Sequence, residues 1–181
     1  MNKAEWRVLL DAISAGHVVA ELDLVATSRG QWIQNVVQYR IGVEAWALAV
    51  TPGRAAVQVD SLLPGGAVVL LAFDSATMPF SAPAQLKIRV NGAEVNRTEN
   101  SFELFLTSEL RAPDAWYSVL QFPGTVLALY LPALAAVSIE IASSPSVPTN
   151  AGFDVGSQVA MIAALALVSA AAARMLRRRD E

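Results

Sequence analysis

The sequence contains one histidine, His17, and no cysteine, so few residues are available for nucleophilic or metal chemistry. A serine hydrolase needs a histidine as its general base. His17 lies between an expected helix and the first expected strand, and the chain has no Gly-x-Ser-x-Gly motif. The lack of cysteine excludes disulfides and cysteine nucleophiles, and it leaves zinc or copper poorly provided with ligands. We expect His17 to be structural.

The carboxylates are also scattered along the chain. A glycosidase needs two that face each other about 5–9 Å apart, and the candidates by residue type are Glu99, Glu103 and Glu109. A calcium site needs clustered oxygen ligands, but no DxDxDG-type loop contains the aspartates Asp60, Asp74, Asp114 and Asp154. The chain also lacks a glycine-rich phosphate loop. We therefore predict a protein that is not an enzyme and has no metal or cofactor.

Four aromatic residues suggest a surface on which sugar rings stack: Trp32, Trp46, Trp116 and Tyr117. Aromatic side chains at strand spacing more often belong to the core, and we favour that interpretation. A glycan-binding or ligand-binding module thus remains the alternative prediction, with Trp116 and Tyr117 as its contacts.

Asn96-Arg97-Thr98 matches the Asn-x-Ser/Thr acceptor sequence for N-glycosylation. It follows an expected hairpin, so we expect Asn96 to be exposed and to accept a glycan if this part of the chain lies outside the cytoplasm.

The strongest signal for cellular location is at the C-terminus. Residues 155–173 contain no charge, and a helix of about 19 residues is roughly 28 Å long, close to the thickness of a bilayer core. Four arginines follow, Arg174, Arg177, Arg178 and Arg179, and arginine at such a position anchors a helix among lipid phosphates. The sequence predicts a single transmembrane helix at 155–176 and a basic tail at 177–181, with burial against a partner protein as the alternative.

Small residues recur at every fourth position of this segment, at Gly156, Ala160 and Ala164. A small-xxx-small ridge lets another helix approach closely, so these three residues are candidates for helix packing with a partner subunit or a second copy.

The sequence VPTNAG, the uncharged run and the arginine cluster together resemble the three-part C-terminal sorting signals of prokaryotic surface proteins. The resemblance covers about 35 residues, and it implies that a short motif is cut and re-attached. Pro148 is not followed by the Thr-Gly pair of the sortase motif.

Composition agrees with a folded body that carries a membrane appendage. Hydrophobic residues make up 54% of the chain and charged residues 16%, and the mean hydropathy is +0.43. The net charge is −3 although the last eight residues hold four arginines, so residues 1–173 are acidic. Because phosphate binding needs clustered Lys and Arg, only the basic tail is expected to contact nucleic acid.

The orientation in the membrane stays open. The positive-inside rule places the arginine tail in the cytoplasm, yet Arg7, Asp11 and His17 interrupt any signal-peptide core near Met1. We considered an upstream start, a tail-anchored protein with a cytosolic body, and a component of a virus with an internal membrane.

The remaining residues indicate one helix followed by strands. Asn2 and Glu5 form a capping-box pattern at the start of a helix over 2–16, whose apolar face has helical spacing. Residues 37–44 alternate like a half-buried strand that continues past a bulge near Glu44–Ala45. Residues 67–73 suit a central strand, and Asn91-Gly92 predicts a two-residue hairpin. Further strands are expected at 101–107, 116–122, 125–131 and 137–142.

About eight or nine short strands with little helix between them predict a mainly β protein: an antiparallel β-sandwich of jelly-roll or immunoglobulin-like type. The expected organisation is an N-terminal helical segment at 1–17, the sandwich at 18–142 and a linker at 143–154, followed by the membrane helix and tail. The predicted function is a structural or interaction subunit of a larger assembly, in a cell envelope or a virion capsid, whose partners are the lipid bilayer and other protein subunits.

Overall fold

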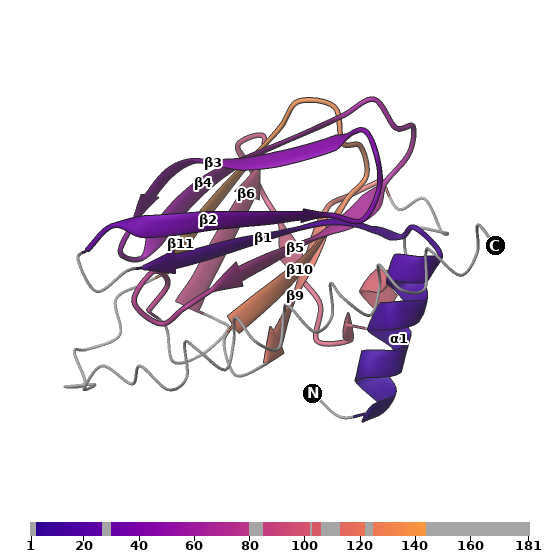
Figure 1. The fold of residues 1–181 in the computed structure, drawn as a ribbon, viewed down its shortest axis with the longest axis horizontal. Coiled ribbons are helices and arrows are strands. Elements are labelled where there is room, and N and C mark those ends of the chain that lie inside the picture. Colours follow the sequence, from indigo (N-terminus) through magenta and orange to yellow (C-terminus); the bar gives the residue numbers. More distant parts are fainter. Residues whose placement is uncertain are drawn as a thin grey trace.

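A computed structural model describes residues 3–26, 30–79, 85–101, 103–105, 113–121 and 125–143 (Figure 1). Within these ranges lie the helix α1 (Lys3–Ser14) and eleven strands. In chain order the strands are β1 (Val18–Ala26), β2 (Trp32–Gln38), β3 (Val43–Thr51), β4 (Arg54–Ser61), β5 (Ala67–Phe73), β6 (Leu86–Val90), β7 (Ala93–Glu94), β8 (Asn96–Arg97), β9 (Trp116–Gln121), β10 (Thr125–Leu131) and β11 (Val137–Ser143).

The strands form two sheets that face each other, which confirms the predicted mainly β sandwich. Sheet A has the order β2-β1-β5-β10-β9-β8, and sheet B has the order β3-β4-β11-β6-β7. Apolar side chains from both sheets fill the space between them, and the fully buried ones include Leu22, Leu71, Phe73, Leu129 and Ile139. These side chains form the main core, which lies between the two sheets.

Sheet A is mixed, so the prediction of a wholly antiparallel sandwich was wrong in this respect. β1 pairs with β5 in parallel, and the short β8 pairs with β9 in parallel. The cause is the path of the chain between β1 and β5. It runs back along β2, crosses to sheet B for the β3–β4 hairpin, and returns beside β1 in the original direction.

The predicted N-terminal helix is confirmed, and it covers the outer face of sheet A. Leu9 and Ile13 of α1 are buried there with Val68 and Tyr130 of the sheet. The helix ends at Ser14, and Gly16 follows in the turn with a φ of +77°, which suits glycine just after a helix C-terminus. Asn2 of the predicted capping box lies outside the described residues.

The strand predicted over 101–107 was wrong. Residues 101 and 103–105 are helical, and Leu104 and Phe105 are buried in the same apolar cluster as α1. The apolar alternation of this segment therefore reflects one turn of helix that packs onto the outer face of sheet A.

Two predicted features of the strands differ from the structure, and one predicted hairpin is confirmed. Residues 37–44 are not one strand, since β2 ends at Gln38 and β3 begins at Val43 after a turn in which Gly42 has a φ of +86°. The irregularity of β3 lies between Ala47 and Ala49, not at Glu44–Ala45. The Asn91-Gly92 hairpin is confirmed, with φ values of +50° and +81° at these residues and Arg89 opposite Glu94.

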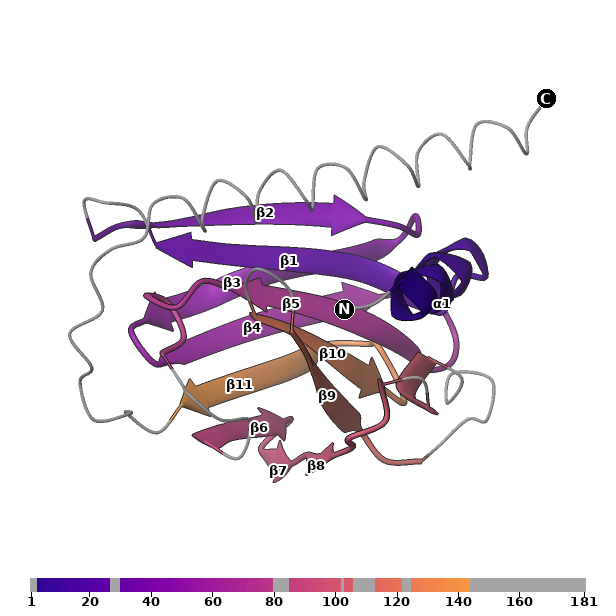
Figure 2. The same ribbon diagram turned by 90° about the horizontal axis from the view of Figure 1, so that it is seen from below.

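The strands give the sandwich two distinct ends. β1, β3, β5 and β11 all finish at one of them, which we call the exit end because the chain leaves β11 there at Ser143. Figure 2 shows the arrowheads of β1 and β11 at this end and α1 toward the other, which we call the far end. Ser143 belongs to β11 and not to the linker predicted from residue 143.

Candidate functional site

The residues predicted to anchor the protein and to pack against a partner helix lie outside the described residues. They are Gly156, Ala160, Ala164, Arg174, Arg177, Arg178 and Arg179. Within the described part of the chain, no helix has the length and hydropathy needed to cross a membrane.

The candidate catalytic and calcium-binding residues are spread over the fold. The main-chain carbonyl of His17 accepts a hydrogen bond from the Val68 amide at 2.8 Å, in the turn between α1 and β1. Asp60 and Asp74 have structural roles, because their carboxylates accept hydrogen bonds from main-chain amides. Among the described residues, no three His, Asp or Glu side chains come close enough together to hold a metal ion. Glu109 and Asp154 lie outside those residues.

The aromatic platform on Trp116 and Tyr117 was wrong in its geometry. Successive residues of a strand point to opposite faces, so Tyr117 enters the core between the sheets while Trp116 packs in the cluster under α1. Tyr117 is 5% exposed, and its hydroxyl donates to the Leu86 carbonyl at 3.5 Å. These two side chains cannot stack on the same sugar.

Asn96 is exposed on β8, at one edge of sheet A. The Thr98 amide donates to the Tyr117 carbonyl at 2.8 Å, which holds the acceptor sequence along β9. The exposure agrees with the expectation for this sequence, and glycosylation itself stays a prediction.

A pair of buried carboxylates on β1 was missed by the sequence analysis. Glu21 is 2% exposed and Asp23 is 6% exposed, on the same face of sheet A. The Tyr39 hydroxyl donates to Oε2 of Glu21, and the Asn35 amide donates to Oδ2 of Asp23 at 3.3 Å. The other oxygens, Oε1 of Glu21 and Oδ1 of Asp23, find no hydrogen-bond partner among the described residues. The signal that could have revealed this pair is the presence of two acids within the apolar run VVAELDLVA.

Burial changes the acidity of these groups. It raises the pKa of Glu21 to about 7, against the opposing effect of the hydrogen bond from Tyr39, and the negative charge of Asp23 adds to the increase. Burial likewise raises the pKa of Asp23, and the pKa of the Tyr39 hydroxyl is raised by burial and by Glu21. Glu21 therefore changes its protonation state near neutral pH, which gives the fold a pH-dependent element.

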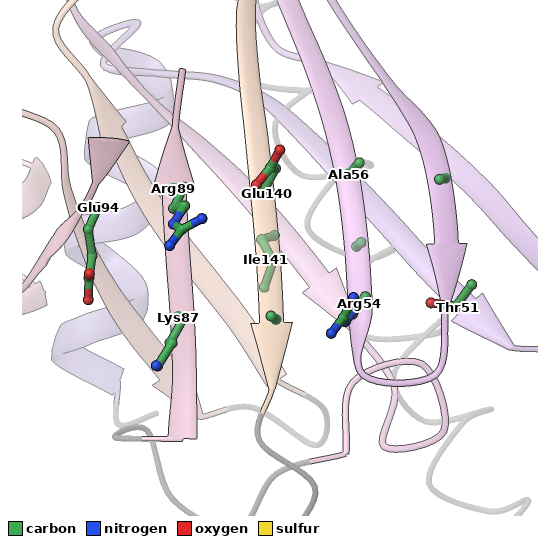
Figure 3. Close-up of a pocket in the computed structure, with 11 residues that line it drawn as sticks. Thr51, Arg54, Ala56, Lys87, Arg89, Glu94, Glu140 and Ile141 are labelled. Carbon is green, nitrogen blue, oxygen red and sulfur yellow. The ribbon is translucent and has the colours of Figure 1, made fainter. Parts of the chain in front are cut away.

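A second feature is a hollow of about 590 Å³ on the exposed face of sheet B (Figure 3). Small side chains line its middle, at Ala49, Ala56 and Ala142. Exposed charged side chains surround them: Arg54, Lys87, Arg89, Glu94 and Glu140. Alanines that leave space between charged side chains make this surface able to receive a small polar group.

The charged residues that line the hollow form two rows, each running across neighbouring strands of sheet B. Glu140, Arg89 and Glu94 are neighbours in register on β11, β6 and β7, so Arg89 lies between two carboxylates. One step nearer the exit end, Ala142 separates Arg54 from Lys87, and neither cation has an acidic neighbour in register. Arg54 and Lys87 are thus the residues best placed to attract an anion, since guanidinium and ammonium groups bind carboxylate or phosphate oxygens through charge-assisted hydrogen bonds.

Apolar side chains are exposed at the far end. Ile41 is 94% exposed in the turn before β3, and Leu62 is 97% exposed just after β4. Val43 and Ser61 are paired in register between them, so the two side chains lie on adjacent loops. We call Ile41 and Leu62 the far-end pair.

No protein-family model matches this chain, and no curated protein matches its sequence.

Proposed function

We propose that the chain is a non-enzymatic structural or interaction subunit, in which a β-sandwich is tethered to a membrane by residues 155–176. The observation that supports this proposal is that the chain leaves the β-sandwich at the end of an internal strand, β11. β11 lies between β4 and β6 in sheet B, and the Ser143 amide donates to the Gly53 carbonyl at 2.8 Å. The uncharged segment and the arginine cluster therefore follow a strand that is paired on both sides, which suits a body that is held through its C-terminus.

The far-end pair supports a role in assembly. Large apolar side chains that are almost fully exposed are candidates for contacts with other proteins. Ile41 and Leu62 lie at the end opposite to Ser143, so a tethered body would present them away from the membrane, where a neighbouring subunit or a second copy could cover them. The assembly is a cell-envelope complex or a membrane-containing virion, and the basic tail would meet lipid headgroups or, in a virion, nucleic acid.

The test is whether the full chain behaves as an integral membrane protein. Membranes that contain the full chain would be washed with alkaline carbonate, and we expect the protein to stay in the pellet. The variant Leu165→Arg with Val168→Arg places two charges in the middle of the segment, where charge is costly in a bilayer, and it should move to the supernatant. A parental chain that is monodisperse in buffer without detergent would overturn the proposal.

Orientation would be measured on the same membranes by protease protection, with a tag at each end of the chain. Cleavage of the N-terminal tag alone places the sandwich on the accessible side. That result, combined with the origin of the vesicles, distinguishes a tail-anchored body from one exposed at the surface.

The hollow on sheet B favours a second candidate function, a module that binds an acidic ligand such as a uronate-containing glycan. Its contacts would be Arg54, Lys87 and Arg89 in place of the aromatic residues first considered. Titration of glucuronate into the full chain in detergent, followed by calorimetry, tests this candidate. Binding that is lost in Arg54→Ala and kept in Arg97→Ala supports it, and the absence of binding to the parental chain contradicts it.

A further inference from the structure

The two ends of sheet B differ in charge. Arg54 and Lys87 lie at the exit end, exposed and without an acidic neighbour in register. At the far end, Glu44 and Asp60 are exposed and directly opposite each other on β3 and β4. Along the strands of sheet B, the cations Arg54 and Lys87 thus lie where the chain leaves, and the carboxylates Glu44 and Asp60 lie at the opposite end.

The described residues at the exit end include one acid, Asp74. It is 5% exposed, and its carboxylate accepts hydrogen bonds from the main-chain amides of Thr77 and Ala26. The same end exposes an aromatic and an aliphatic side chain at the start of β2. Trp32 is 39% exposed and Ile33 is 58% exposed, and Trp32 is in register with Ala26 at the end of β1. Tryptophan at the same end of a body as lysine and arginine is typical of proteins that contact the membrane interface.

We propose that the exit end is a membrane-binding surface that rests on anionic phospholipids, with Arg54 and Lys87 on the lipid phosphates and Trp32 and Ile33 at the interface. This inference rests on the proposed function, because the tether sets the distance between body and bilayer. About 11 residues separate Ser143 from the uncharged segment, so the exit end lies no farther from that segment than about 40 Å, the length of 11 fully extended residues. The far end lies a further strand length away from Ser143, about 30 Å for the nine residues of β1, so the exit end is the part of the body that is held nearer to the bilayer.

Charge then decides whether the exit end touches the lipid. Each cation near an anionic surface contributes about 1 kcal/mol, so Arg54 and Lys87 together favour the docked state by roughly 30-fold at low salt. In a neutral bilayer this contribution is absent, and in high salt it is screened. Docking should therefore depend on lipid charge while membrane insertion does not.

The lack of cysteine provides a direct test. Ser75→Cys places a single fluorophore on an exposed residue of the exit end, and Ala135→Cys places the same fluorophore at the far end as a positional control. The full chain would be incorporated into nanodiscs of phosphatidylcholine or of a phosphatidylcholine–phosphatidylglycerol mixture, with a quencher attached to a lipid headgroup. We expect strong quenching of the Ser75→Cys probe in the anionic discs, weak quenching in the neutral discs, and weak quenching of the Ala135→Cys probe in both.

Charge variants identify the contacts. Arg54→Ala with Lys87→Ala should reduce quenching in anionic discs to the level of neutral discs. The control, Lys3→Ala with Arg7→Ala, removes the same charge from exposed positions of α1 and should leave quenching unchanged. Thermal unfolding of both variants checks that the body is folded.

The outcomes separate the inference from the proposed function. A chain that does not enter the nanodiscs overturns the tether, and the inference with it. A chain that enters both kinds of disc, but whose Ser75→Cys probe is unquenched or is insensitive to lipid charge and to the Arg54–Lys87 variant, overturns the inference alone. Glucuronate binding at the hollow without quenching would assign these cations to a soluble ligand instead.

Discussion

The hydroxyl of Tyr39 donates a hydrogen bond to one oxygen of the Glu21 carboxylate, and the other oxygen of Glu21 has no partner in the part of the chain that the structure describes. The residues in register with Glu21 on the two neighbouring strands are Val37 and Leu70, which are apolar. A carboxylate in this environment is less stable than a carboxylic acid, which ties the stability of the sandwich to pH.

Stability should fall as the pH rises through the titration range of Glu21. The pKa of Glu21 is about 7 in the folded protein and 4.5 for the reference group, so the folded state retains a proton that the unfolded chain loses. The free energy of unfolding therefore decreases between about pH 4.5 and pH 7, by about 3 kcal/mol in total. Asp23, whose pKa is also raised, contributes in the same direction.

Denaturant unfolding of Glu21→Gln at several pH values tests this expectation. The variant should lose most of this pH dependence and be more stable than the parental chain at pH 8. Glu44→Gln, which changes an exposed carboxylate, is the control and should keep the parental dependence. A Glu21→Gln variant with the parental slope would contradict the assignment.

Replacement of Asp74 by alanine should destabilise the exit end. Its carboxylate accepts the Thr77 amide at 2.6 Å and the Ala26 amide at 2.9 Å, so it joins the turn after β5 to the end of β1. Hydrogen bonds to a charged group are worth about 1.5–3 kcal/mol each, and we expect a loss of about 3 kcal/mol in chemical denaturation. Asp60→Ala, which removes one exposed bond to the Ala136 amide at 3.0 Å, should cost about 1 kcal/mol. Equal losses in the two variants would refute this difference.

Gly66 should not tolerate a side chain. A Cβ atom there would lie 2.8 Å from the Leu131 carbonyl oxygen and would also overlap the Tyr130 hydroxyl. Gly66→Ala should therefore lower stability by about 2–3 kcal/mol through overpacking. The neighbouring Gly65 has open space around the same position and a φ of +90°, so Gly65→Ala should show only the backbone strain, about 1 kcal/mol. Thermal unfolding of the two variants would reveal whether the steric contact dominates.

Charge on the far-end pair should prevent assembly without affecting the fold. Ile41→Asp and Leu62→Asp alter side chains that are almost fully exposed, so stability should change by less than about 0.5 kcal/mol. If these side chains contact another subunit, cross-linking in membranes should lose the oligomeric species that the parental chain forms. An unchanged cross-linking pattern would show that assembly uses another surface.

Much of the fold could be predicted from local patterns. The helical spacing of apolar residues located α1, and the Asn91-Gly92 pair set the register of the β6–β7 hairpin, because both features depend on neighbours in the chain. The apolar run 67–73 was correctly assigned to a central strand, since β5 pairs on both sides.

The two candidate sites could not be predicted, because they depend on pairing between distant segments. Glu21 is buried by a sheet whose neighbouring strands include β5, almost fifty residues later. The hollow requires β11 to lie between β4 and β6, which places Ala142 between Arg54 and Lys87. Residues 101 and 103–105 were misassigned because a short apolar segment has the same composition in a helical turn and in a strand.

The order of the strands also has a consequence for how the protein is made. β1 is synthesised first, but its parallel neighbour β5 follows about forty residues later, and β11, the last strand, fills the gap between β4 and β6. A growing polypeptide therefore cannot close either layer until almost the whole body has left the ribosome. Such non-local topologies fold slowly, so newly made chains should depend on chaperones that shield VVAELDLVA and AVVLLAF from aggregation during translation.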